Sequence, residues 1–267
     1  MSGFSSQWLD AREPIDHRAR SEAVLAAVRQ HFENFGTLKV TDIGCGTGST
    51  LRALKPVLKN TLSWHLIDHD DTLLDQAKTY LQGDEMTFSL ADLSKSVDTV
   101  FANQPQLLTT SAFLDLVSES WLKTFCEHVT QHQTPFYAAL SYDGRVGCKP
   151  ELQTDVEVLK AFNHHQKTDK GFGPALGPDA AETVIRLFEN FGFKVVSDRS
   201  DWIGNPEDKL FQELLIEGWH QAACEIDPHK KAHFDSWLSQ RLKLIDSGKA
   251  SVFVGHIDFF AIPETMA

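Results

Sequence analysis

The chain has 267 residues, of which 42% are hydrophobic and 23% charged, which is the composition of an ordinary globular protein. Its formal net charge of -12 disfavours nucleic acid and anionic membranes as partners, because both are themselves negatively charged. The first residues lack the charged and apolar pattern of a signal peptide, and no apolar stretch is long enough for a membrane span. We therefore expect a cytoplasmic protein.

The cysteines, at positions 45, 126, 148 and 224, form no CxxC pair, so the sequence predicts neither a zinc motif nor a redox motif. Single cysteines in a reducing compartment are typically small buried residues. No cluster of acidic and amide residues can be assigned to a metal either. The sequence thus predicts no metal site.

The first half of the chain alternates helices with short apolar strands. The first helix is expected to run from Asp16, as its N-cap, to Phe35, with Gly36 ending it. Strands separated by helices indicate right-handed crossovers and a parallel sheet. The further expected elements are strands at 38–43, 64–67, 86–90, 107–113 and 136–142, and helices at 49–58, 72–81 and 118–132.

The pattern changes after the fifth strand, where a loop rich in glycine and proline interrupts the helices. No linker or internal repeat divides the chain, so one domain is expected. The expected elements of this half are helices at 151–165, 179–191 and 207–224, strands at 194–198 and 251–262, and the loop at 170–178.

A glycine loop, Asp-Ile-Gly-Cys-Gly-Thr-Gly, follows the first strand and ends at Gly48. Alternate glycines permit a tight turn and the close approach of a ligand, and the helix that follows presents its amide dipoles to that ligand. The spacing departs from the GxGxxG of dinucleotide enzymes, whose third glycine would replace Ser49. Asp42, which opens the loop, would repel a pyrophosphate, but it can accept a hydrogen bond from the ammonium group of S-adenosylmethionine.

The loop resembles the first motif of class I S-adenosylmethionine-dependent methyltransferases, and the resemblance covers about residues 36–142. It implies that the loop lies against the amino-acid part of the cofactor, through Asp42, Gly44, Cys45, Gly46 and Gly48. It also implies an α/β fold, with a doubly wound, mostly parallel, seven-stranded Rossmann-like sheet, helices on both faces and an antiparallel last strand.

Within that single domain, 1–267, we expect three parts. The cofactor-binding core is expected at 36–142, an inserted helical lid over the substrate at 143–180, and the C-terminal completion of the sheet at 181–267. The lid is dense in polar groups and hinge glycines, a composition that is typical of loops that close over a ligand.

Two acids at strand ends complete the expected adenosine site. Asp68 ends the second strand, where a carboxylate can accept both ribose hydroxyls, and we place His69 beside it. The alternative role for Asp68 is to cap the next helix, but Asp70 or Asp71 could also be the cap. The family uses an acid at the position of Asp92 for the adenine amino group, and the backbone amide of Leu93 for the ring. The alternative for Asp92 is to begin a turn.

Two arginines precede the first strand, in a segment that covers the cofactor in many relatives. Arg12 or Arg20 can offer a planar fork to the methionine carboxylate. An exposed ion-pair face is the alternative for both.

Methyl transfer to a neutral hydroxyl or an amine requires alignment, exclusion of water and sometimes a base. The acceptor is expected above the fourth and fifth strands, near Asp115 and Tyr142. Asp115 can instead cap the following helix. His165 lies close to the glycine hinge and is a candidate to take up a proton, as histidine often does in catalysis, with a solvated helix end as its alternative. His256 alternates with apolar residues and is expected to be a sheet residue with satisfied hydrogen bonds.

The Asn-Pro-Pro-Tyr and Asp-Pro-Pro-Tyr motifs of enzymes that methylate nucleic-acid amino groups are absent after the fourth strand. Together with the acidic charge, this favours a small-molecule acceptor methylated on oxygen or nitrogen. Two alternatives remain open: an NAD-dependent oxidoreductase, and a methyltransferase-like binding protein without turnover.

Overall fold

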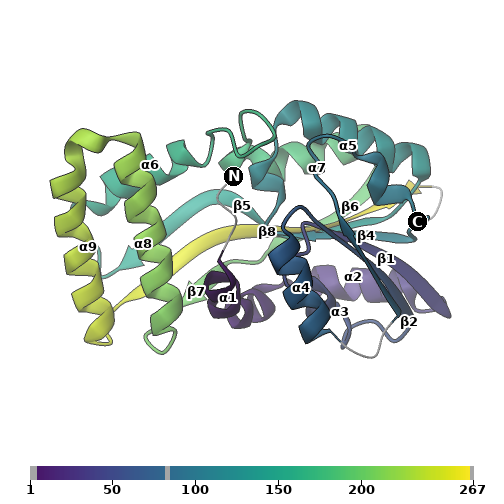
Figure 1. Ribbon diagram of the computed structural model, residues 1–267, viewed down its shortest axis with the longest axis horizontal. Coiled ribbons are helices and arrows are strands. Elements are labelled where there is room, and N and C mark those ends of the chain that lie inside the picture. Colours follow the sequence, from purple (N-terminus) through teal and green to yellow (C-terminus); the bar gives the residue numbers. More distant parts are fainter. Residues whose placement is uncertain (1–4, 82–84, 265–267) are drawn as a thin grey trace.

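The computed structural model describes residues 5–81 and 85–264, and its centre is a sheet in the order β3-β2-β1-β4-β5-β8-β6, with β7 paired to β8 (Figure 1). β1 to β5 run parallel, whereas β8 is antiparallel to β5, β6 and β7. The mostly parallel sheet and its antiparallel last strand are confirmed, and β7 is additional to the seven predicted strands. The strands are β1 (Thr37–Ile43), β2 (Thr61–Asp68), β3 (Glu85–Leu90), β4 (Leu107–Ser111), β5 (Phe136–Lys149), β6 (Phe193–Arg199), β7 (Trp202–Gly204) and β8 (Ser251–Pro263).

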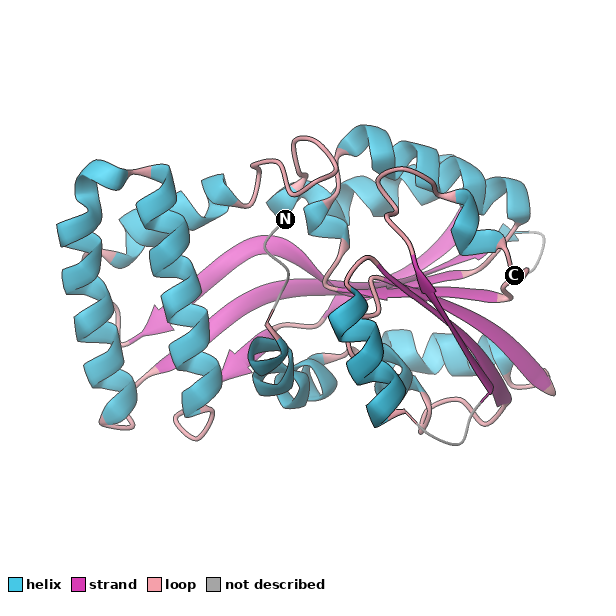
Figure 2. Ribbon diagram, viewed as in Figure 1, coloured by secondary structure: helices cyan, strands magenta, loops and turns pink. Residues whose placement is uncertain are grey.

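Helices cover both faces of the sheet, as predicted (Figure 2). One face packs against α5 and α7 through a core that includes Phe125 and Phe188, and the other packs against α2, α3 and α4 through a core that includes Phe32 and Trp64. The helices are α1 (Ser6–Ala19), α2 (Glu22–Phe32), α3 (Ser49–Leu54), α4 (Asp71–Tyr80), α5 (Glu119–His132), α6 (Asp155–His165), α7 (Ala180–Asn190), α8 (Lys209–Ile226) and α9 (Lys231–Asp246).

The helix predicted from Asp16 to Phe35 is in fact two helices, α1 and α2. Arg20 is extended between them, and Ser21 caps α2 by accepting a hydrogen bond from the Val24 amide at 3.3 Å. The backbone N–H of Ser21 also donates to Asp258 in β8 at 3.0 Å. Asp16 is not an N-cap but a buried residue inside α1. The break depends on a partner 237 residues away in the sequence, which helical periodicity cannot reveal.

The first residues of the predicted lid, 143–149, belong to β5 instead. This strand has 14 residues and stays paired with β8 as far as Lys149 and Ser251, across two irregularities in register. The pairing with β8 supplies the backbone hydrogen bonds, and Cys148 is buried, so the polar Asp-Gly-Arg stretch does not end the strand. The remaining lid segment, 150–180, contains α6 and the loop after it.

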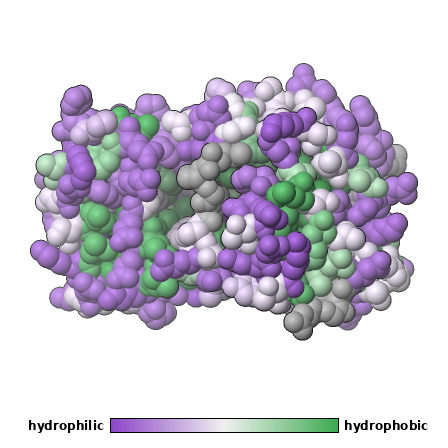
Figure 3. All heavy atoms as spheres, viewed as in Figure 1, coloured by the Kyte–Doolittle hydropathy of each residue, from purple (hydrophilic) through white to green (hydrophobic). Residues whose placement is uncertain are grey.

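The long ends of β5 and β8 extend beyond the core of the sheet, where β7, α6, α8 and α9 pack around them (Figure 1). We call this part the helical lobe. The face of the molecule seen in Figure 3 is mainly hydrophilic. It carries apolar patches, one of which lies over α8 and α9. Helix α9 was not predicted from the sequence, although Phe234, Trp237, Arg241 and Ile245 are buried at helical spacing.

Helix α1 bridges the two parts of the molecule. Trp8 stacks on Phe211 of α8, with ring centroids 5.8 Å apart, and its edge meets Trp202 of β7. On the core side, Glu13 forms a two-pronged ion pair with Arg52 of α3 at 2.6 Å. The helix therefore fixes the helical lobe against the start of α3, next to the glycine loop.

Candidate functional site

The glycine loop lies between the end of β1 and the start of α3. Gly44, Gly46 and Gly48 all have positive φ, and that of Gly46 is +53°. A Cβ on Gly44 would lie 2.8 Å from Phe113, and a Cβ on Gly46 would lie 3.5 Å from Leu9 of α1. The alternate glycines are therefore required by the backbone conformation, and α1 covers the loop from the outside.

Asp42 is fully buried behind this loop. Its Oδ1 accepts a hydrogen bond from Thr109 of β4 at 2.7 Å, whereas its Oδ2 is buried without a hydrogen-bond partner among the described residues. Burial raises the pKa of Asp42 to about 7, against the opposing effects of the Thr109 hydroxyl and the Arg20 guanidinium. An orphaned oxygen on a buried carboxylate indicates a missing cationic or hydrogen-bonding partner.

Asp68 ends β2 and holds the glycine loop in place. It accepts hydrogen bonds from the backbone N–H of Gly46 at 2.8 Å and of Asp70 at 3.0 Å, and His69 Nδ1 lies 3.3 Å from it. Burial raises the pKa of Asp68, but these hydrogen bonds outweigh burial and lower it overall. The N-cap of α4 is Asp70, which accepts from Thr72 and Leu73, so capping does not require Asp68.

Asp92 begins a turn after β3, which is the alternative that the sequence left open. Its Oδ1 accepts from both the amide and the hydroxyl of Ser94, and its Oδ2 pairs with Lys95 at 2.9 Å. These contacts lower the pKa of Asp92 to about 2. The turn places the carbonyl of Leu93 against Trp121 of α5, whose indole N–H donates to it at 2.7 Å.

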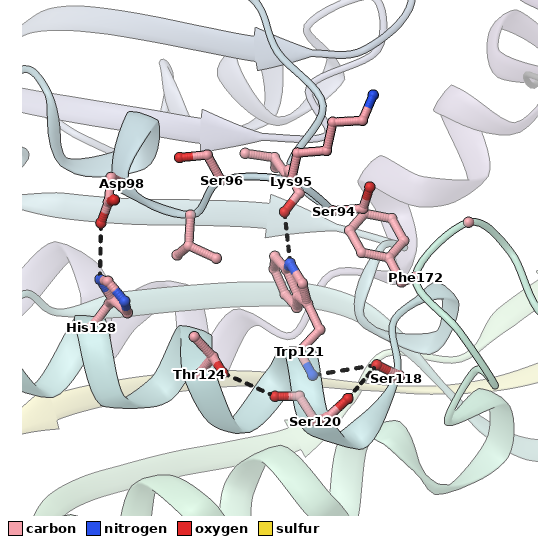
Figure 4. A pocket seen from close by; sticks show the side chains of 13 residues that line it. Ser94, Lys95, Ser96, Asp98, Ser118, Ser120, Trp121, Thr124, His128 and Phe172 are labelled. Atoms are coloured by element: carbon pink, nitrogen blue, oxygen red, sulfur yellow. Dashed lines mark hydrogen bonds and ion pairs between the residues drawn. The ribbon is translucent and has the colours of Figure 1, made fainter.

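A pocket of about 500 Å³ opens beside Leu93, between the turn after β3 and α5 (Figure 4). Phe172, from the loop after α6, and Trp121 line one end, and the Asp98–His128 pair lines the other. Phe172 and Trp121 pack edge to face, with ring centroids 5.3 Å apart. The loop after α6 thus reaches the predicted adenosine side of the site.

The two candidate arginines have different surroundings. Arg20 is buried, donates to the Tyr137 hydroxyl at 3.1 Å and to Ser111 at the end of β4 at 3.3 Å, and leaves its Nε without a partner among the described residues. Arg12 pairs with Asp16 at 3.2 Å, and its guanidinium lies 5.7 Å from the Trp202 ring centroid. Arg20 thus bonds to a residue at the carboxyl end of a core strand.

Asp115 and Tyr142 both contact polar residues of the lid segment. Asp115 is buried, and its Oδ2 lies 3.5 Å from the side-chain amide of Gln166. Tyr142 donates to Asn163 Oδ1 at 2.6 Å. Burial raises the pKa of Asp115 to about 6, while burial and the charge of Asp115 raise the pKa of Tyr142. Asp115 is not the cap of α5, because Ser118 fills that position.

His165 lies at the end of α6 and is turned toward α8. Its Nε2 lies 2.9 Å from Glu225, and its Nδ1 lies 3.2 Å from the ammonium group of Lys170. The structure therefore brings Asp115 and Tyr142 toward the lid segment, and pairs His165 with the helical lobe. A role for His165 in proton transfer stays a prediction.

His256 was predicted to be a sheet residue with satisfied hydrogen bonds, but its ring is not fully paired. Its backbone N–H donates to Asp201, but its ring Nδ1 is buried without a partner among the described residues. The ring centroid lies 4.5 Å from that of Trp202 and 6.1 Å from that of Tyr142. Burial, together with the charge of Arg12, lowers the pKa of His256 to about 3, so the ring is neutral at pH 7. The alternating pattern in the sequence located the strand but not this orphaned nitrogen.

The parallel strands β1 to β5, with an antiparallel β8 inserted between β5 and β6, define the class I S-adenosylmethionine-dependent methyltransferase fold. No protein-family model and no curated protein matches the sequence. Among residues 5–81 and 85–264, no helix combines the length and the apolar character that crossing a membrane requires.

Solved structures share this fold at low sequence identity. A cyclopropane-fatty-acyl-phospholipid synthase-like protein from Lactobacillus casei has a TM-score of 0.54 at 12% identity, over 94% of this chain and 91% of that one. A candidate methyltransferase from Bacillus halodurans has a TM-score of 0.51 at 15% identity, over 90% and 98%. A cyclopropane synthase from Mycobacterium tuberculosis has a TM-score of 0.50 at 12% identity, over 96% and 94%.

Proposed function

We propose that this chain is an S-adenosylmethionine-dependent methyltransferase that acts on an oxygen or nitrogen atom of a small-molecule acceptor. The observation that carries the proposal is two orphaned polar atoms: Asp42 Oδ2 behind the glycine loop, and Nε of Arg20, whose charge acts on Asp42. A zwitterionic amino acid fits that pair, because its ammonium group suits the carboxylate and its carboxylate suits the guanidinium. A pyrophosphate does not fit a buried acid.

The proposed cofactor contacts follow from the same edge of the sheet. The backbone of Gly44, Cys45, Gly46 and Gly48 would line the amino-acid part. Asp68 would accept the ribose hydroxyls, because its Oδ2 carries the single Gly46 hydrogen bond among the described contacts and so retains acceptor capacity. The proposed adenine contacts are Asp92 and Leu93, with His69 beside the ribose and Arg12 at the methionine end.

When bound, S-adenosylmethionine supplies an activated methyl group whose leaving group is a neutral thioether. The residues of this chain then have to hold the acceptor, exclude water and take up the proton of a neutral nucleophile. We assign the proton to the carboxylate of Asp115, because a raised pKa brings that group toward the range of an effective base. Tyr142 and the lid segment 150–180 would position the acceptor.

Thermal unfolding with each cofactor tests the class of ligand. S-Adenosylhomocysteine at about 100 times its dissociation constant should stabilise the protein by about 2.7 kcal/mol, which is roughly 5–10 °C in Tm for a chain of this size. NAD at the same concentration should leave Tm unchanged. Stabilisation by NAD but not by S-adenosylhomocysteine would contradict the proposal and indicate an NAD-dependent oxidoreductase. If the chain bound S-adenosylmethionine but methylated no metabolite in a broad screen, it would be a methyltransferase-like binding protein without turnover.

Replacing Asp115 with asparagine tests the assigned base once an acceptor is known. The wild-type kcat/KM should rise with pH through about 6, because only the deprotonated carboxylate can accept a proton. The variant should lose this rise and lower kcat by roughly 10²- to 10⁴-fold. Asp75→Asn, on the exposed surface of α4, is the control and should keep both the rate and the pH profile. An unchanged profile in Asp115→Asn would remove this residue from the mechanism.

A further inference from the structure

Three side chains of metal-ligating type, from α8 and α9, lie close together in the helical lobe, where these two helices are side by side (Figure 1). His220 and Cys224 are one turn apart on α8, and Asp235 faces them from α9. His220 Nε2 lies 2.8 Å from Asp235 Oδ1 and 3.5 Å from Cys224 Sγ. One donor atom from each residue lies within 4.8 Å of the other two.

The geometry distinguishes a metal site from a proton relay. In a relay of cysteine, histidine and acid, the two ring nitrogens face different partners. Here the same Nε2 faces both the thiol and the carboxylate. Three donors this close together can occupy three corners of a tetrahedron around one ion, which would leave the fourth corner to a water ligand.

The ligand types select the metal. A thiolate, an imidazole and a carboxylate together are typical of Zn²⁺, which binds such donors at about 2.0–2.3 Å in tetrahedral geometry. Hard cations such as Mg²⁺ and Ca²⁺ prefer oxygen donors, of which this cluster offers only Asp235. The side chains of His220 and Asp235 are 16% and 47% exposed, so an ion can reach them from solvent.

A cation already neutralises the acid in this cluster. The ammonium group of Lys231, one turn before Asp235 on α9, lies 2.9 and 2.8 Å from its two carboxylate oxygens. A metal ion would displace this ammonium group, and the Cys224 thiol would lose its proton to solvent as the metal–sulfur bond forms. Lys231 is therefore a competitor that can be removed by substitution.

We propose that His220, Cys224 and Asp235 form a Zn²⁺ site that joins α8 to α9. The ion would cross-link two helices that are otherwise held by side-chain packing and by polar contacts such as the Lys209–Asp246 ion pair, and so would stabilise the helical lobe. The site is remote from the glycine loop in the sequence and is independent of the proposed methyl transfer. The sequence pattern hid it, because its donors come from two helices, with ten residues between Cys224 and Asp235.

Titration of the metal-stripped full-length chain with Zn²⁺, and with Co²⁺ as a spectroscopic probe, tests the site. We expect one ion per chain, a thiolate-to-cobalt charge-transfer band with tetrahedral d–d bands, and a Tm that rises with Zn²⁺. Cys224→Ser should remove the charge-transfer band. His220→Gln should weaken binding by roughly 10-fold or more, since even outer-shell substitutions cost 10- to 100-fold.

Two further variants make the test specific. His233→Gln, the matched control, changes an exposed histidine of α9 that pairs with Glu157, and it should bind metal like the wild type. Lys231→Ala should bind Zn²⁺ more tightly than the wild type, because the competing ammonium group is gone. Equal metal binding by the wild type and Cys224→Ser, or no gain in affinity in Lys231→Ala, would overturn the proposed site.

Discussion

Replacing Gly46 with valine should weaken binding of S-adenosylhomocysteine by roughly 100-fold or more, which corresponds to about 2.7 kcal/mol or more. Gly46 has a φ of +53°, a region that β-branched residues avoid. The new side chain would also enter the space between the loop and Leu9 of α1, where a Cβ already lies 3.5 Å from Leu9. Isothermal titration calorimetry of the folded variant measures the loss.

The control is Gly36→Val, because a Cβ at Gly36 meets no atom within 4 Å and that position has no positive φ. It should bind S-adenosylhomocysteine like the wild type. Asp68→Ala should have a smaller effect than Gly46→Val, of about 1–3 kcal/mol, because it removes charge-assisted hydrogen bonds and keeps the loop glycines. Normal affinity in Gly46→Val would show that the ligand binds elsewhere.

Replacing Arg241 with methionine should lower the free energy of unfolding by about 3–5 kcal/mol, because it strands a buried carboxylate. Arg241 is 1% exposed. Its Nε donates to Asp155 Oδ1 at 3.1 Å, its Nη2 donates to Asp155 Oδ2, and its Nη1 donates to the carbonyl of Pro150 at 2.8 Å. The pair ties α9 to the start of α6, so its loss should loosen the helical lobe. Urea unfolding monitored by circular dichroism measures the change.

A double variant separates the stranded charge from the lost packing. Arg241→Met with Asp155→Leu should recover much of the stability, because replacing both partners of a buried pair by apolar residues is often neutral. Arg29→Met is the surface control: its pair with Glu22 spans 3.8 Å between exposed side chains, and its loss should cost less than about 1 kcal/mol. A cost below 1 kcal/mol in Arg241→Met would mean that the pair does not hold the lobe.

Local sequence was sufficient for the glycine loop and for the elements around it. The alternate glycines were predicted to make a tight turn after β1, and positive φ at Gly44, Gly46 and Gly48 confirms it. The strand-end position of Asp68 was equally readable, since a short apolar run ends there. Such features depend on the local backbone conformation and on the periodicity of hydrophobic residues, and both are determined by neighbouring residues.

Contacts between distant residues decided the rest. The break between α1 and α2 depends on the bond from Ser21 to Asp258, and the length of β5 depends on its pairing with β8. The orphaned nitrogen of His256 is buried beside rings from two other strands, Tyr142 of β5 and Trp202 of β7.

The sequence by itself thus determined the alternation of strands and helices from β1 to β5, the parallel sheet and the glycine loop, because hydrophobic periodicity and glycine chemistry act over a few residues. Only the tertiary structure decided which polar atoms are buried without a partner, such as Asp42 Oδ2 and Arg20 Nε. Burial and pairing depend on groups from several elements at once, and no local pattern carries that information.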